Sequence, residues 1–66
     1  MDEKYYYVAR EVAKRTPVTT EQVLLEISNV ISALTGFGYS KEKIDERITI
    51  EHIENIVMKN VAKARG

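Results

Sequence analysis

The chain has 66 residues, one histidine and no cysteine, and its ten basic residues balance its ten acidic residues. This length allows a single domain with a small core, and the lack of cysteine excludes disulfides and thiolate metal sites. A formal net charge of zero argues against strong attraction to nucleic acid through bulk electrostatics.

No segment is long and apolar enough to cross a membrane. The chain starts with Met1-Asp2-Glu3, which is acidic where a signal peptide would be basic. We therefore expect a cytoplasmic protein that forms one helical domain over residues 1–66 and does not associate with a membrane.

The first helix is predicted to begin at a cap provided by Asp2 and to run to about Arg15. Glu11 and Arg15 stand four residues apart in the order that favours an ion pair. Pro17 ends the helix, because the residue before a proline is driven out of the helical region. The apolar face of this helix consists of Tyr5, Val8, Ala9, Val12 and Ala13.

A six-residue pattern occurs twice, as Val18–Val23 and as Ile48–Ile53. Each copy reads apolar, threonine, any residue, glutamate, polar, apolar, and predicts a helix that starts at a cap provided by Thr19 or Thr49. Gln22 completes a capping box in the first copy, whereas a histidine takes its place in the second. The apolar residues at the two ends of each copy stand where a hydrophobic staple forms.

A stretch without charged residues begins within the second predicted helix and extends from Ile27 through Ser40. Gly36 is expected to close the helix in the left-handed conformation, with Phe37 folded back onto Ile31. One interpretation is a central helix flanked by the other two. A short chain has little material to wrap its own middle helix, so we expect instead that a second subunit covers it. The predicted buried face consists of Val23, Leu24, Ile27, Val30, Ile31 and Leu34.

Ser40 is expected to cap a short connecting helix that ends at Ile44, before the last helix begins after Thr49. The apolar face of the last helix consists of Ile53, Ile56, Val57 and Val61. The predicted fold class is all-α: a small bundle of three main helices plus a short connecting helix, expected to be dimeric.

The run Tyr5-Tyr6-Tyr7 spreads three rings around the first helix, because successive helical residues are about 100° apart. One ring can face the core, so the other two are expected to cover neighbouring apolar surface or to contact a partner, since tyrosine is favoured at interfaces. The predicted interface consists of Tyr6, Tyr7, Val23, Ile27, Val30, Ile31, Leu34 and Phe37.

Basic residues collect near two helix ends, where they complement the helix dipoles without any ligand. They form a phosphate or nucleic-acid site only if the two ends converge. A helix-turn-helix docking is disfavoured, because the last helix would present Glu51 and Glu54 to the DNA. The residues concerned are Lys14, Arg15, Lys59, Lys63 and Arg65.

No residue pattern meets the requirements for catalysis, and no metal or cofactor site is expected. Gly36-Phe37-Gly38-Tyr39 follows a helix and lacks the GxGxxG and Walker spacings of phosphate-binding loops. His52 stands alone near a helix start, with no nucleophile or orienting acid beside it in the sequence.

The segments Thr19–Val23 and Ile48–Val57, preceded by Lys14-Arg15-Thr16-Pro17, resemble the later helices of the ATP-cone, the nucleotide-sensing module of ribonucleotide reductases and their repressor. The resemblance covers residues 14–61 and implies a related helical arrangement. The basic, glycine-containing hairpin that opens the cone, and its final helix, have no counterpart here. The resemblance therefore assigns no nucleotide-binding residue.

The leading prediction is a small non-enzymatic interaction or regulatory module that associates with a protein partner and forms a homodimer. A nucleic-acid-binding regulator that uses the basic helix ends is one alternative. An ATP-cone-like nucleotide sensor is the other.

Overall fold

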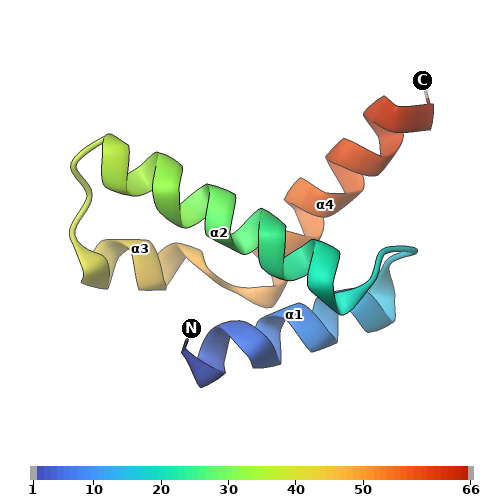
Figure 1. The fold of residues 1–66 in the computed structure, drawn as a ribbon, viewed down its shortest axis with the longest axis horizontal. Coiled ribbons are helices and arrows are strands. Elements are labelled where there is room, and N and C mark those ends of the chain that lie inside the picture. Colours follow the sequence, from blue (N-terminus) through green and yellow to red (C-terminus); the bar gives the residue numbers. More distant parts are fainter. Residues whose placement is uncertain (1, 66) are drawn as a thin grey trace.

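The computed structural model describes residues 2–65, with side chains through Ala64. This part of the chain forms four helices and no strand: α1 (Glu3–Arg15), α2 (Thr20–Gly36), α3 (Lys41–Arg47) and α4 (Ile50–Arg65). In Figure 1, α2 runs across the molecule with α1 and α3 beneath it, while α4 diverges from the start of α2. The predicted all-α architecture of three main helices and one short connecting helix is confirmed for these residues. None of the described helices is long and apolar enough to span a membrane.

Both repeated segments form the capped helix starts that the sequence predicts. The Thr19 hydroxyl accepts the backbone N–H of Gln22 at 3.2 Å, and the Gln22 side chain accepts the backbone N–H of Thr19 at 3.0 Å. The Thr49 hydroxyl accepts the backbone N–H of His52 at 3.1 Å. The first start is therefore a full capping box, and the second has the threonine cap alone.

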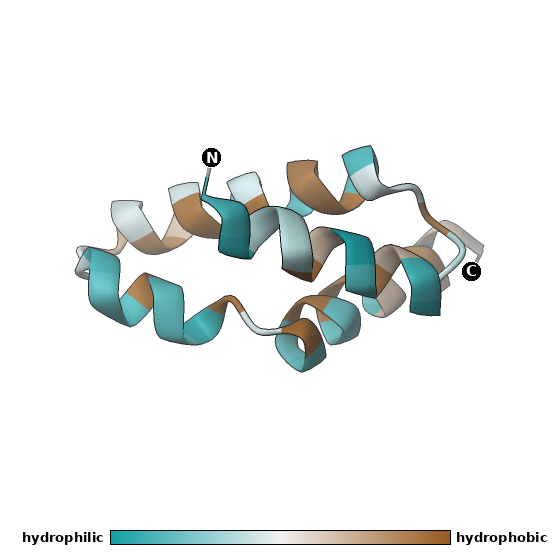
Figure 2. Cartoon of the chain, turned by 90° about the horizontal axis from the view of Figure 1, so that it is seen from below, coloured by the Kyte–Doolittle hydropathy of each residue, from teal (hydrophilic) through white to brown (hydrophobic). Residues whose placement is uncertain are grey.

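The core lies where α1, α2 and α4 meet, and the apolar residues of the repeated pattern are part of it. Val23, Ile48 and Ile53 are fully buried, and Val18 packs against them while partly exposed. In Figure 2, hydrophobic and hydrophilic bands alternate along each helix, as expected for amphipathic helices. The buried cluster consists of Tyr5, Val8, Ala9, Val12, Val23, Ile27, Ile44, Ile48, Ile53 and Val57.

The end of α2 differs from the prediction. The left-handed residue is Gly38, with φ 87°, whereas Gly36 is the last residue of the helix. The backbone N–H of Tyr39 donates to the carbonyl of Leu34 at 3.1 Å, which is the long bond of a Schellman motif. This motif is favoured by apolar residues at these two positions, and closure at Gly36 would put a serine at one of them. Phe37 is 78% exposed, so it does not fold back onto the helix.

Three smaller expectations are also corrected. Asp2 occupies the N-cap position of α1, but its side chain makes no capping hydrogen bond. Glu11 pairs with Lys14, one turn along the same face, at 3.0 Å rather than with Arg15. The short helix α3 is capped by Ser40 as predicted, but it continues past Ile44 to Arg47.

Replacing either capping threonine is expected to destabilise the fold. Thr19→Ala and Thr49→Ala each leave a backbone N–H without its acceptor and should lower the free energy of unfolding by about 1 kcal/mol. Urea unfolding followed by circular dichroism measures the loss. Thr20→Ala, one residue inside α2, is the matched control and should change the value by less than about 0.5 kcal/mol. Equal losses in all three variants would contradict the capping role.

Candidate functional site

The predicted interface residues of α2 fall into two groups. Val23 and Ile27 are fully buried in the chain's own core, so they contribute to the fold and offer no surface to a partner. Val30, Ile31 and Leu34 are partly buried and lie along the second half of α2. This half of the helix contains no fully covered residue after Ile27, because the core is concentrated toward the start of α2.

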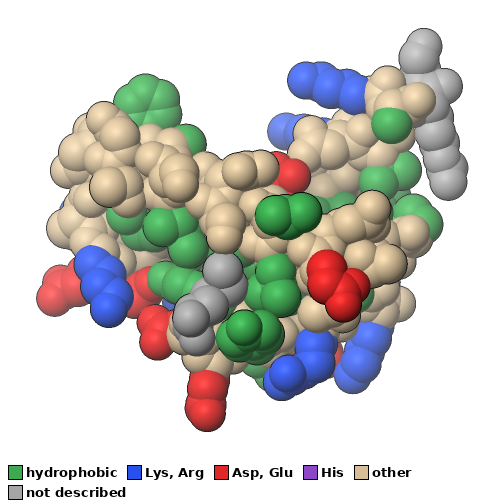
Figure 3. Space-filling view, viewed as in Figure 1, with side chains coloured by type: hydrophobic (Ala, Val, Ile, Leu, Met, Phe, Trp, Pro, Cys, Tyr) green, Lys and Arg blue, Asp and Glu red, His purple; other side chains and the backbone are tan. Residues whose placement is uncertain are grey.

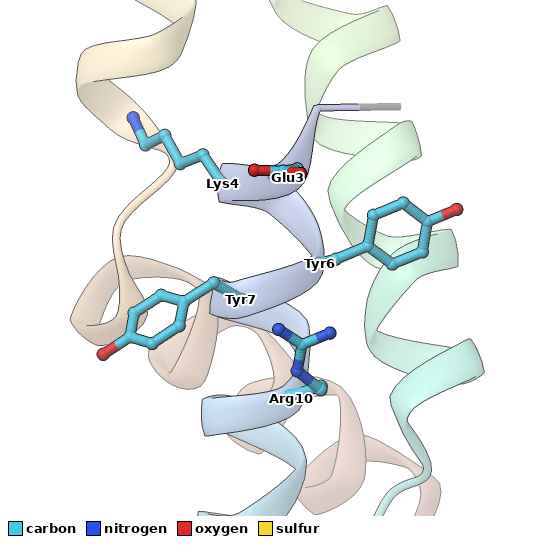
Figure 4. Close-up of a pocket in the computed structure, with 5 residues that line it drawn as sticks. All are labelled: Glu3, Lys4, Tyr6, Tyr7 and Arg10. Carbon is cyan, nitrogen blue, oxygen red and sulfur yellow. The ribbon is translucent and has the colours of Figure 1, made fainter.

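The two remaining interface tyrosines lie on the outer side of α1. Tyr5 is buried, whereas Tyr6 is 43% exposed and Tyr7 is 53% exposed. Figure 4 shows that the Tyr6 and Tyr7 rings point to opposite sides of the helix, with Arg10 between them. Together with Glu3 and Lys4 they border a shallow hollow of about 580 Å³. Because all its walls come from one helix, the hollow cannot enclose a small molecule, but it can receive side chains that protrude from a partner.

The other predicted aromatic residue, Phe37, lies at the far end of α2. In Figure 3, apolar side chains come to the surface over this end of the helix. Tyr39, two residues later, is partly covered by the guanidinium of Arg47, whose carbon lies 4.9 Å from the ring centroid. The hollow beside Tyr6 and Tyr7 is lined by α1 residues alone. Phe37 is therefore not part of it.

The basic residues proposed to contact phosphate do not converge within one chain. Lys14 and Arg15 are exposed at the end of α1, and Lys59 and Lys63 are exposed on the second half of α4. Figure 1 shows these two helix ends at different corners of the molecule, and in Figure 3 basic side chains appear separately over each. The side chain of Arg65 lies outside the described residues.

A polar contact inside the fold was not anticipated from the sequence. The Tyr5 hydroxyl donates a hydrogen bond to the side chain of Asp45, and Lys4 donates to the Asp45 backbone carbonyl, so α1 is tied to α3. The hydrogen bond to the Asp45 carboxylate, together with burial and the negative charges of Asp45 and Asp2, raises the pKa of Tyr5 from 10.0 to about 12. The two residues that form this hydrogen bond are 40 positions apart in the sequence, so only the folded chain reveals it.

Two further surface features involve residues that the sequence reasoning left out. Leu25, 66% exposed, and Met58, 43% exposed, are large apolar side chains on the outer sides of α2 and α4. Leu25 also borders a groove of about 390 Å³ between α2 and the second half of α4, with Val61 and Ala64 on its other side. The sequence does contain a signal for Leu25. Because it directly follows two residues that face the core, it must lie outside the apolar face of the helix.

No group of three or more potential metal-ligating side chains is present among the described residues. His52 is exposed, and its backbone N–H serves the Thr49 cap. The described residues thus bring the aromatic and charged side chains of α1 together, and they leave the basic helix ends apart.

Comparison of the chain with models of known protein families, with curated proteins and with solved structures finds no match. The resemblance of residues 14–61 to the ATP-cone therefore stays a prediction. The two capped helix starts on which it was based are present, but such starts occur in many helical folds.

The bond between Tyr5 and Asp45 should make stability depend on alkaline pH. Folding raises the pKa of Tyr5 from 10.0 to about 12. The contribution of the protonated Tyr5 hydroxyl to the free energy of unfolding is therefore complete below pH 10 and is lost as the pH rises through 12. The difference in free energy of unfolding between wild type and Tyr5→Phe should therefore be constant up to this window and shrink within it. Urea unfolding at a series of pH values measures the difference, and the other tyrosines cancel because both proteins contain them. Two parallel pH curves would contradict the prediction.

Proposed function

We propose that this chain is a small non-enzymatic interaction module that acts by protein–protein association and forms a homodimer. The observation that carries the proposal is the exposure of large apolar or aromatic side chains on every long helix of the described part. Exposed aromatic side chains that lie together, as Tyr6 and Tyr7 do beside one hollow, are common at contact sites between proteins. On the helices the large exposed side chains are Tyr6, Tyr7, Leu25 and Met58, and Phe37 and Tyr39 follow directly after α2.

The charge distribution on α2 is compatible with self-association. From Ile27 through Ser40 the chain carries no charged residue, and the second half of α2 is only partly covered by the chain itself. Two copies can bring such surfaces together without placing like charges opposite each other or removing charges from water. The formal net charge of zero likewise leaves little long-range repulsion between copies.

The working surface that we propose includes Tyr6, Tyr7 and Phe37, which lie at two separate places. A module with two contact places can hold a second copy through one and a different protein through the other. This arrangement would suit a regulatory subunit or an adaptor.

The proposal predicts that molar mass in solution depends on protein concentration. Light scattering from micromolar to millimolar concentration should show a rise from the monomer toward the dimer. The variant Tyr6→Ser/Tyr7→Ser should shift this rise to higher concentration, because it removes aromatic area from the contact. Asn55→Ser is the control, since Asn55 is exposed on α4 and is not among the side chains that carry the proposal. A wild-type mass that stays monomeric throughout would show that the proposed homodimer is wrong.

A further inference from the structure

The outer face of α1 carries a regular row of side chains, Glu3, Tyr7, Arg10 and Lys14, which we call the outer row. Their spacing of four, three and four residues places them on one side of a helix. All four are exposed, and the core-facing residues of α1 lie on the opposite side. Figure 4 shows the first three of them on the face that is turned away from the other helices.

The charges of the outer row run from acidic to basic. Glu3 is in the first turn of α1, and Lys14 is in the last. A second copy in parallel orientation would place Glu3 against Glu3 and Arg10 against Arg10, which is repulsive. In antiparallel orientation Glu3 meets Lys14, and Arg10 meets the uncharged Tyr7.

We infer that a second copy of this chain docks on the outer row with its own outer row, the two α1 helices lying antiparallel about a two-fold axis. This inference rests on the proposed homodimer and names the surface that forms it. In the antiparallel arrangement of two helices, positions spaced by four and three residues pair across the axis. Glu3 then lies opposite Lys14 of the second copy, and Tyr7 lies opposite its Arg10. Because of the two-fold symmetry, each of these pairings occurs twice in the dimer.

The chemistry of each pair fits this arrangement. An arginine guanidinium over a tyrosine ring is attracted by the negative face of the ring. The Lys14 ammonium lies 3.0 Å from Glu11 within its own chain and has a side chain that is 72% exposed, so it can also meet the carboxylate of a second copy. The hollow between the Tyr6 and Tyr7 rings gives room for the arginine and tyrosine side chains of the partner.

The contact is expected to be weak and sensitive to salt. A helix of 13 residues is about 20 Å long, so the pair buries much less than the roughly 1,200 Å² of a stable complex. Exposed ion pairs are screened as the Debye length falls from about 10 Å at 0.1 M salt to about 3 Å at 1 M. The dissociation constant should therefore rise with salt, whereas apolar contact through α2 would not weaken.

Sedimentation equilibrium of charge-reversal variants tests the inference. Glu3→Lys and Lys14→Glu each replace two attractive pairs by two repulsive ones and should raise the dissociation constant about fivefold or more. The double variant Glu3→Lys/Lys14→Glu restores opposite charges and should return the constant to within about twofold of wild type. Glu21→Lys is the matched control, because Glu21 is likewise exposed in the first turn of its helix, on α2. Circular dichroism checks that each variant is folded.

The outcomes separate the inference from the proposed function. Weakening in the single variants, recovery in the double variant and weakening of wild type by salt would support the antiparallel contact. A wild-type dimer that is indifferent to Glu3→Lys, Lys14→Glu and salt would overturn the contact through α1 and leave the homodimer standing. A wild-type monomer at every concentration would overturn both. The salt series needs only the wild-type chain, so a variant that fails to fold does not prevent a decision.

Discussion

The structure depends on the burial of two capped helix starts against α1. The caps at Thr19 and Thr49 fix where α2 and α4 begin, and Val23 and Ile53, the last apolar residues of the two repeated segments, are completely enclosed. Val12 of α1 is enclosed with them. A chain of 66 residues encloses only a small core, which is concentrated at this crossing and also includes Ile44 of α3. The later parts of α2 and α4 extend beyond it and stay partly uncovered.

This distribution of burial explains the character of the surface. The end of α2 is held by backbone hydrogen bonds around Gly38 and by its contact with α3, and neither covers Phe37. Beside this end of α2, the hydrogen bond from Tyr5 to Asp45 fixes α1 with one tyrosine inward. The remaining two tyrosines of the run must then face outward, where they stand beside Arg10. The same constraint that stabilises the monomer thus produces the surface that we propose for a second copy.

The sequence predicts well what depends on neighbouring residues. Both threonine caps and the three main helices could be inferred, because each signal lies within a few residues of its effect. The left-handed residue was predicted at Gly36 and is Gly38, since the choice depends on which residue pair closes the helix end. Other features depend on how helices that are distant in the sequence pack together. These are the burial of Val23 and Ile27 in the chain's own core and the hydrogen bond between Tyr5 and Asp45. The separation of the basic helix ends also depends on this packing, because sequence spacing does not give the directions in which α1 and α4 point.

The most direct test of self-association through α1 is an isotope-filtered NMR experiment on a mixture of labelled and unlabelled wild-type chains at millimolar concentration. Only contacts between copies appear in such a spectrum. Antiparallel association predicts signals between the Tyr7 ring and the Arg10 side chain of the other copy, and between Glu3 and Lys14. Signals that connect α2 residues instead, or no signals between copies at all, would contradict it.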